Sequence, residues 1–174
     1  MATNNLSIYD QETVPNGSGL KIGIVVSEWN DEITENLYLG AQEALVENGV
    51  EPEDIIRMNV PGSFELIYGS KLLLQTTEVD AVIALGSVVR GETPHFDFVC
   101  NAVAMGIKDI NIQFETPVIF GLLTDDNYSQ AEARSGGDKG NKGVECAIAA
   151  LKMAGLSSVL MHDSDDDSID FESL

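Results

Sequence analysis

The sequence predicts an α/β fold, in which a four-stranded parallel sheet forms the middle layer of a three-layer α/β/α sandwich. Two observations predict it: four short apolar runs are rich in β-branched residues, and a helical pattern follows each of them. Such runs are too short for helices and are typical of strands buried on both faces. Strands that alternate with helices form right-handed βαβ units, which give a parallel sheet covered by helices on both faces.

The first unit begins with KIGIVVS, residues 21–27, which we expect to form a strand. Asn30 is predicted to be the N-cap of the following helix, because Asp31 and Glu32 come next and apolar residues then recur at helical spacing. Gly49 is predicted to end this helix, since glycine is favoured just past a helix C-terminus.

Three further units repeat this pattern. Their strands are predicted over residues 55–60, 80–88 and 117–124, and their helices after Pro61, from Thr93-Pro94, and over 130–134 and 142–154. The arrangement is flavodoxin-like, and in such sheets ligands bind beyond the carboxyl ends of the strands. The loops at those ends are therefore where we look for a site.

The chain divides into three parts on composition. We expect an N-terminal arm over residues 1–20, one folded domain over 21–156, and an acidic C-terminal tail over 157–174. The last twelve residues, DSDDDSIDFESL, contain six acids and no base, which is typical of a solvated, disordered segment. No linker-like stretch divides the body, and its length and 44% hydrophobic content suffice for one core.

The charge argues against polyanionic partners. The formal net charge is −20, which repels nucleic acid phosphates and anionic membrane surfaces. No apolar run is long enough to span a bilayer, and MATNNLSIYD does not resemble a signal peptide. We therefore expect a soluble, cytoplasmic protein that binds neither nucleic acid nor membrane.

Several kinds of chemistry have no support in the sequence. Cys100 and Cys146 sit in apolar stretches, as small buried residues usually do, so no disulfide is expected. No pair among these cysteines, His95 and His162 has metal-ligand spacing, so no zinc site is expected. The turn after the first strand, SEWN, lacks the dinucleotide fingerprint, and no Walker loop or nucleophile elbow is present. We expect no metal and no cofactor.

The stretch RGETPH, residues 90–95, is the first candidate site element. Thr93 is predicted as the N-cap and Pro94 as the first residue of a helix, whose free amides would point at an anion in the crevice. His95 would lie in the first turn, where the helix dipole favours the neutral imidazole that a proton acceptor needs. The alternative is an ordinary capped helix with a surface histidine.

Three other groups are candidates, each with a structural alternative. Arg134, Lys139 and Lys142 form a basic cluster that could bind a phosphate or carboxylate, or could neutralise nearby acids. Trp29 could stack on a planar ring or close a hydrophobic corner. Glu65, in the stretch Ser63-Phe64-Glu65, could bind a polyol or compensate a helix dipole.

The sequence resembles the 6,7-dimethyl-8-ribityllumazine synthase family. The resemblance covers residues 21–154 and is carried by six stretches in order: GIVVSEWNDEIT, NVPGSFEL, ALGSVVRGETPHFDFVC, PVIFGLLTDDN, QAEAR and GNKGVECA. It implies a transferase of riboflavin biosynthesis that joins 5-amino-6-(D-ribitylamino)uracil to 3,4-dihydroxy-2-butanone 4-phosphate, releasing phosphate and water without a metal or redox cofactor.

The resemblance also implies residue roles. His95 would assist proton transfer, while Arg134 and the amides of Glu92 and Thr93 would hold the phosphate. Trp29 would stack on the pyrimidine, and the remaining contacts to the ring and the ribityl chain would come from Asn30, Ser63, Phe64, Glu65, Val88, Val89, Lys142 and Phe120, the last from a neighbouring subunit. Trp29 replaces a common phenylalanine, and Asp138 stands where relatives often have lysine.

The assembly that the resemblance implies is a homopentamer, which some members build into icosahedral shells. The N-terminal arm would lie along a neighbour's sheet edge, and riboflavin synthase is a candidate partner. Two rival functions remain: a non-catalytic binder of riboflavin or lumazine, and a flavodoxin-like electron carrier that holds flavin mononucleotide. The presence of His95 and Arg134 disfavours the first, and the SEWN loop disfavours the second.

Overall fold

The computed structural model describes residues 5–162 and contains the predicted parallel sheet. The strands are β1 (Ile22–Ser27), β2 (Ile55–Val60), β3 (Ala81–Val89) and β4 (Val118–Asp125), in the order β2-β1-β3-β4. All neighbouring pairs are parallel. β1 and most of β3 are fully buried, as their continuous apolar runs predict.

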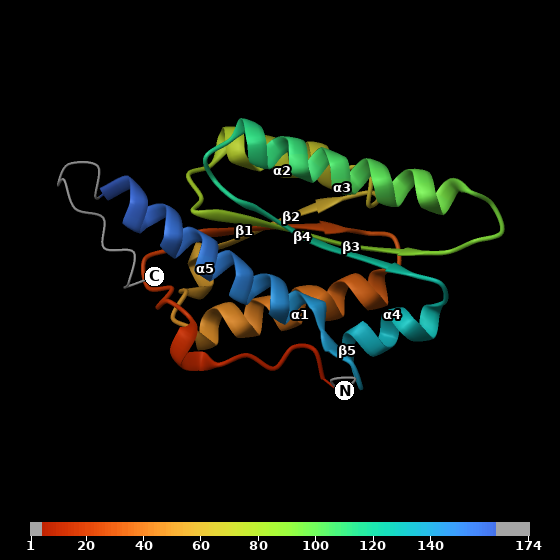
Figure 1. Cartoon of the computed structure of the whole chain (residues 1–174), viewed down its shortest axis with the longest axis horizontal. Helices are drawn as coiled ribbons and strands as arrows, with labels where there is room; N and C mark the ends of the chain where they lie inside the picture. Colours follow the sequence, from red (N-terminus) through yellow and green to blue (C-terminus); the bar gives the residue numbers. More distant parts are fainter. Residues whose placement is uncertain (1–4, 163–174) are drawn as a thin grey trace.

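Helices cover both faces of the sheet, so the three-layer prediction is confirmed (Figure 1). One face carries α2 (Leu66–Thr76) and α3 (His95–Gln113), and the other carries α1 (Asp31–Glu47) and α5 (Lys142–His162). A buried apolar cluster fills the space on each side of the sheet. The packed sheet therefore holds the carboxyl ends of its parallel strands together at one edge.

The connection between β4 and α5 contains elements that the sequence did not predict. After the short helix α4 (Tyr128–Arg134), β5 (Ser135–Gly137) and β6 (Gly140–Asn141) form an antiparallel hairpin. Gly136 and Gly140 have φ values of 115° and 89°, which glycine adopts readily. Gly136 and Gly137 both belong to the strand β5.

Two short 3-10 helices, Gln11–Thr13 and Pro52–Asp54, complete the described elements. α1 ends as predicted, with Gly49 at φ 97° just past its C-terminus. The helix α5 continues past Ala154 to His162, so residues 157–162 are helical although we assigned them to the tail. The predicted disorder of residues 163–174 lies outside the described residues.

The described part of the N-terminal arm hydrogen-bonds to its own chain. Leu6 N donates to Lys139 O at 3.1 Å, Asn141 N donates to Ser7 Oγ at 2.6 Å, and Gly17 N donates to Asn48 O at 2.7 Å. The arm therefore runs along α1 and the β5-β6 hairpin within one subunit. Contact with a neighbour's sheet edge stays a prediction. None of the helices over residues 5–162 has the length and apolarity to cross a bilayer.

Candidate active site

A pocket of about 770 Å³ lies beyond the carboxyl ends of β1, β2 and β3, where a parallel sheet binds its ligands. Nine of the predicted site residues line it: Trp29, Asn30, Ser63, Phe64, Glu65, Val88, Val89, Thr93 and His95. The lining also includes residues that sequence reasoning did not single out, among them Ser87, Phe96 and Val99. Ser87 and Phe96 each adjoin a predicted site residue in the chain, and that proximity was the signal that could have found them.

Two exposed aromatic side chains stand at this pocket. Trp29 is 73% exposed and Phe64 is 55% exposed, and each follows the end of a strand. An indole this exposed does not close a hydrophobic corner within the chain, and stacking of Trp29 on a planar ring stays a prediction. Both rings are free to offer a face to a planar ligand.

Asn30 is the N-cap residue of α1, as predicted, but its side chain makes no capping hydrogen bond. Its backbone is left-handed, with φ 58° and ψ 50°, a conformation that asparagine tolerates better than most residues. The amide Nδ2 instead donates to Ser87 O at 3.0 Å, and the Ser63 hydroxyl lies 3.5 Å from the same oxygen. These contacts join the ends of β1, β2 and β3 beside the pocket.

The start of α3 also differs from the prediction. The helix begins at His95 with Pro94 in the N-cap position, and no side chain caps it. Thr93 therefore precedes the cap and cannot satisfy the first-turn amides as predicted. Within residues 5–162, the side chains of Glu92, Thr93 and His95 form no hydrogen bond, and all three are exposed. The imidazole and the uncapped helix start are thus available to a ligand.

Arg134, Lys142 and Phe120 do not line this pocket, and neither does Glu92. Arg134 ends α4 and donates to Lys139 O at 2.8 Å and to the Glu145 carboxylate at 2.7 Å. Lys142 Nζ lies 3.0 Å from the other oxygen of that carboxylate. Within one chain, Glu145 therefore pairs with both cations, as the structural alternative for the basic cluster expected, and leaves a net charge of about +1.

The charge of Arg134 affects the pKa of Asp125, which lies at the end of β4. Burial raises the pKa of its carboxyl, Arg134 opposes that change, and Asp126 adds to it. Oδ2 of Asp125 is buried and has no hydrogen-bond partner within residues 5–162. Arg134 thus faces acids from both β4 and α5.

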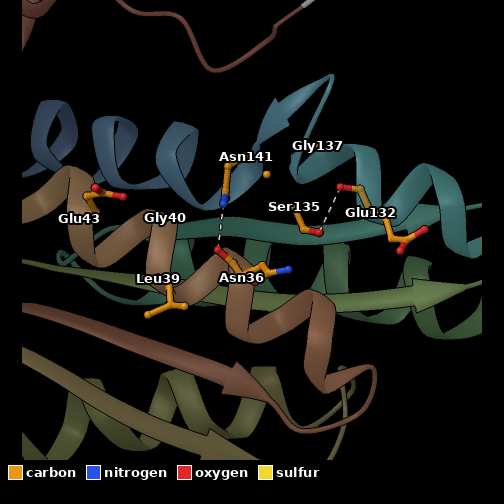
Figure 2. Close-up of a pocket in the computed structure, with 9 residues that line it drawn as sticks. Asn36, Leu39, Gly40, Glu43, Glu132, Ser135, Gly137 and Asn141 are labelled. Atoms are coloured by element: carbon orange, nitrogen blue, oxygen red, sulfur yellow. Dashed lines mark hydrogen bonds between the residues drawn. The ribbon is translucent and has the colours of Figure 1, made fainter.

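A second pocket, of about 420 Å³, separates α1 from the α4–β5 connection (Figure 2). Asn141 Nδ2 donates to Asn36 O at 2.8 Å across it, and Gly40 lets the Asn141 side chain approach α1 closely. The lining contains Glu43 and Glu132 but no base. It contains none of the predicted site residues and is unsuited to a phosphate. Nowhere in residues 5–162 does a cluster of three or more acids, histidines or cysteines offer a metal site.

The comparisons with known proteins decide the family. The family model described as 6,7-dimethyl-8-ribityllumazine synthase matches residues 19–158. The chain belongs to this family. Members of the lumazine synthase family are transferases of riboflavin biosynthesis, and the chain is an enzyme of that class.

Curated relatives agree over most of the chain. A 6,7-dimethyl-8-ribityllumazine synthase from Christiangramia forsetii is 61% identical over 90% of this chain and 95% of its own length. One from Flavobacterium johnsoniae is 62% identical over 88% and 82% of the two chains. One from Porphyromonas gingivalis is 55% identical over 91% and 98%. The resemblance found in the sequence is confirmed.

Proposed function

We propose that this chain condenses 5-amino-6-(D-ribitylamino)uracil with 3,4-dihydroxy-2-butanone 4-phosphate to form 6,7-dimethyl-8-ribityllumazine, with its site completed by a second copy. The observation that carries the proposal is one pocket, in a member of this family, that collects nine predicted site residues from three strand ends. The penultimate step of riboflavin biosynthesis is therefore the reaction we assign to it.

Each part of the pocket suits a part of this reaction. The exposed faces of Trp29 and Phe64 stack on the pyrimidine ring, and Ser63 and Glu65 offer hydrogen-bonding groups to the ribityl hydroxyls. The backbone of Val88 and Val89 borders the ring site. Imine formation, loss of phosphate and ring closure all need proton transfers, which the His95 imidazole assists at the mouth of the same pocket.

Phosphate binding supports a site between two copies. The pocket lining contains no lysine or arginine, although a phosphate carries about two negative charges that favour a cation partner. We assign that cation to Arg134 of a neighbouring copy, together with its Phe120 and Lys142, while the Glu92 and Thr93 amides bind the phosphate from the pocket side. Hydrogen bonds to Glu145 and Lys139 occupy two of the five guanidinium N–H groups of Arg134, so others remain free.

The surface of the chain supports a ring assembly. Phe98, Met105 and Ile112 are exposed on α3 at intervals of seven residues, which puts them on one face of the helix. β2 and β4 are both edge strands, and open edges favour pairing with another chain. We therefore propose a head-to-tail homopentamer, free or built into an icosahedral shell, that works in the cytoplasm and hands its product to riboflavin synthase.

The experiment is to mix the purified chain with the two substrates and follow lumazine fluorescence, with sedimentation velocity in parallel. We expect lumazine and released phosphate in equal amounts, from a pentamer or a multiple of it. Flavin binding without lumazine formation would instead support the carrier functions. Full activity in a monomer would overturn the shared site.

A further inference from the structure

The guanidinium of Arg90 joins three segments beside the pocket. Arg90 follows the last residue of β3, and its backbone N donates to Asp125 O at 2.9 Å. Its Nε donates to Asp126 at 2.9 Å, and its two terminal nitrogens lie 3.2 and 3.4 Å from the two carboxylate oxygens of Asp97. Its Cζ also lies 4.1 Å from the centroid of the Phe96 ring. One side chain therefore holds the end of β3, the first turn of α3 and the loop before α4.

These contacts need the shape of arginine as well as its charge. A planar guanidinium can accept a carboxylate along one edge, a second acid at Nε and an aromatic ring on its face. An ammonium group cannot make all three contacts at once. The hydrogen bonds to Asp97 and then to Asp126 raise the pKa of Arg90, so it stays charged. The Arg90 side chain is 41% exposed, so its ion pairs add little to the free energy of unfolding. Its main effect is to fix the relative positions of the segments that it contacts.

The residues between these contacts, 91–95, have few contacts of their own that would hold them in place. Glu92, Thr93 and His95 have no side-chain hydrogen bond among residues 5–162, and α3 has no side-chain cap. An added Cβ at Gly91 would meet no atom within 4 Å, so no neighbouring group packs against this position. The segment is fixed at its two ends, and Arg90 ties those ends together through Phe96 and Asp97.

We propose that Arg90 is a positioning residue, which sets the placement of His95 and of the Glu92-Thr93 amides by clamping Phe96 and Asp97 to Asp126. The proposal rests on the proposed function, because it assigns the proton-transfer and phosphate-binding groups to this loop. We do not assign Arg90 to substrate binding, because it does not line the pocket and three of its five N–H groups donate to carboxylates within the chain.

The test uses Arg90→Gln, Arg90→Lys and Asp97→Asn in the full-length assembled enzyme. For all three we expect kcat to fall about 10- to 100-fold, because displacing a catalytic group by about 1 Å can cost a factor near 100. The KM for the butanone phosphate rises, while the KM for the pyrimidine changes by less than about threefold, since its binding groups follow other strands. Arg90→Lys loses as much as Arg90→Gln, because the charge alone does not make the clamp.

Arg57 offers a matched control. It also pairs with a carboxylate, that of Glu35, and its Cζ lies 4.3 Å from the centroid of the Tyr38 ring. It lies on β2 and does not line the pocket. We expect Arg57→Gln to leave kcat within about twofold of the parent, because it removes an equivalent interaction that does not touch the loop.

Amide hydrogen exchange over residues 90–97 supplies the second readout. We expect faster exchange in the three clamp variants and parent-like exchange in Arg57→Gln. Unchanged kcat in Arg90→Gln would overturn the proposal, as would a loss of kcat without faster exchange, which would mean that Arg90 acts on the substrate. Equal losses in Arg57→Gln would also overturn it. If the parent enzyme forms no lumazine, the proposed function fails, and exchange alone then decides whether the clamp exists.

Discussion

His95 combines exposure with a place at the mouth of the pocket, so its removal tests chemistry with little effect on packing. We expect His95→Gln to lower kcat about 100-fold or more, since a positioned proton-transfer group contributes roughly 10²- to 10⁴-fold. Assembly and thermal stability should not change. Lys108→Gln is the control and should retain parent activity, because it removes an exposed cation whose one ion-pair partner among residues 5–162 is the adjacent Asp109.

Trp29 tests the stacking assignment at the same scale. Trp29→Ala should raise the KM for the pyrimidine about tenfold, since stacking on an aromatic side chain is worth roughly 1–3 kcal/mol per base. Trp29→Phe keeps a stacking face and should raise it less than about threefold. Steady-state kinetics on both variants provides the measurement. A KM that is insensitive to Trp29→Ala would place the pyrimidine elsewhere.

The site residues that the sequence could predict share a physical cause. Parallel strands end at one edge, so the residues after β1, β2 and β3 meet there whatever the details of the loops. The absence of side-chain capping by Asn30 and Thr93 could not be predicted, because capping depends on backbone angles such as the left-handed φ of Asn30. The pairing of Arg134 with Glu145 depends on the unpredicted hairpin between them.

At the scale of elements, Gly143 shows why α1 and α5 can pack closely. A Cβ at this position would collide with the Leu37 carbonyl of α1. We expect Gly143→Ala to lower the free energy of unfolding by about 1–3 kcal/mol, as overpacking usually does. Urea unfolding measures the change, and Gly91→Ala, with open space around its Cβ, should be nearly neutral. Equal stability of the two variants would contradict this packing.

The ion pair between Glu35 and Arg57 ties α1 to β2 and predicts a pH dependence. The hydrogen bond from Arg57 lowers the pKa of Glu35 below its ordinary value of 4.5. A lowered acid pKa gives stability that is present above about pH 4.5 and is lost as the pH falls through the folded-state pKa. Glu35→Gln should therefore be less stable than the parent at pH 7, by under about 1 kcal/mol because the pair is exposed.

Urea unfolding at pH 7 and at about pH 3 would measure this difference, which should shrink at the lower pH as Glu35 is protonated. Glu78→Gln, at an acid without a salt bridge among the described residues, serves as the matched control. A deficit of Glu35→Gln that is as large at pH 3 as at pH 7 would contradict the assigned role of the ion pair.

The four strands were predicted within about one residue at each end, because burial on both faces leaves a clear pattern, and helical periodicity placed the start of α5 at Lys142. The strand predicted over 80–88 lies at Ala81–Val89, and that over 117–124 lies at Val118–Asp125. The β5-β6 hairpin had no such pattern, since it is five residues of mostly glycine. The end of α5 was also missed, because the acidic composition that follows masked its helical periodicity.

At the scale of the whole molecule, one chain does not bring all the proposed groups together. His95 and eight other predicted residues line one pocket, while Phe120, Arg134 and Lys142 stand outside it. The proposed head-to-tail ring would join these two sets, because each copy would offer one set to each neighbour. Assembly would then bring Phe120, Arg134 and Lys142 of one copy to the pocket of the next and so complete the active site.

The most direct measurement is complementation between His95→Gln and Arg134→Ala. Each variant alone should be nearly inactive, but each retains one intact half of the site. When the two are coexpressed in equal amounts, random mixing in a ring gives about a quarter of the boundaries both intact halves, so about a quarter of parent activity should return. Activity no greater than the sum of the two separate variants, in mixed particles verified by mass spectrometry, would contradict a site shared between copies.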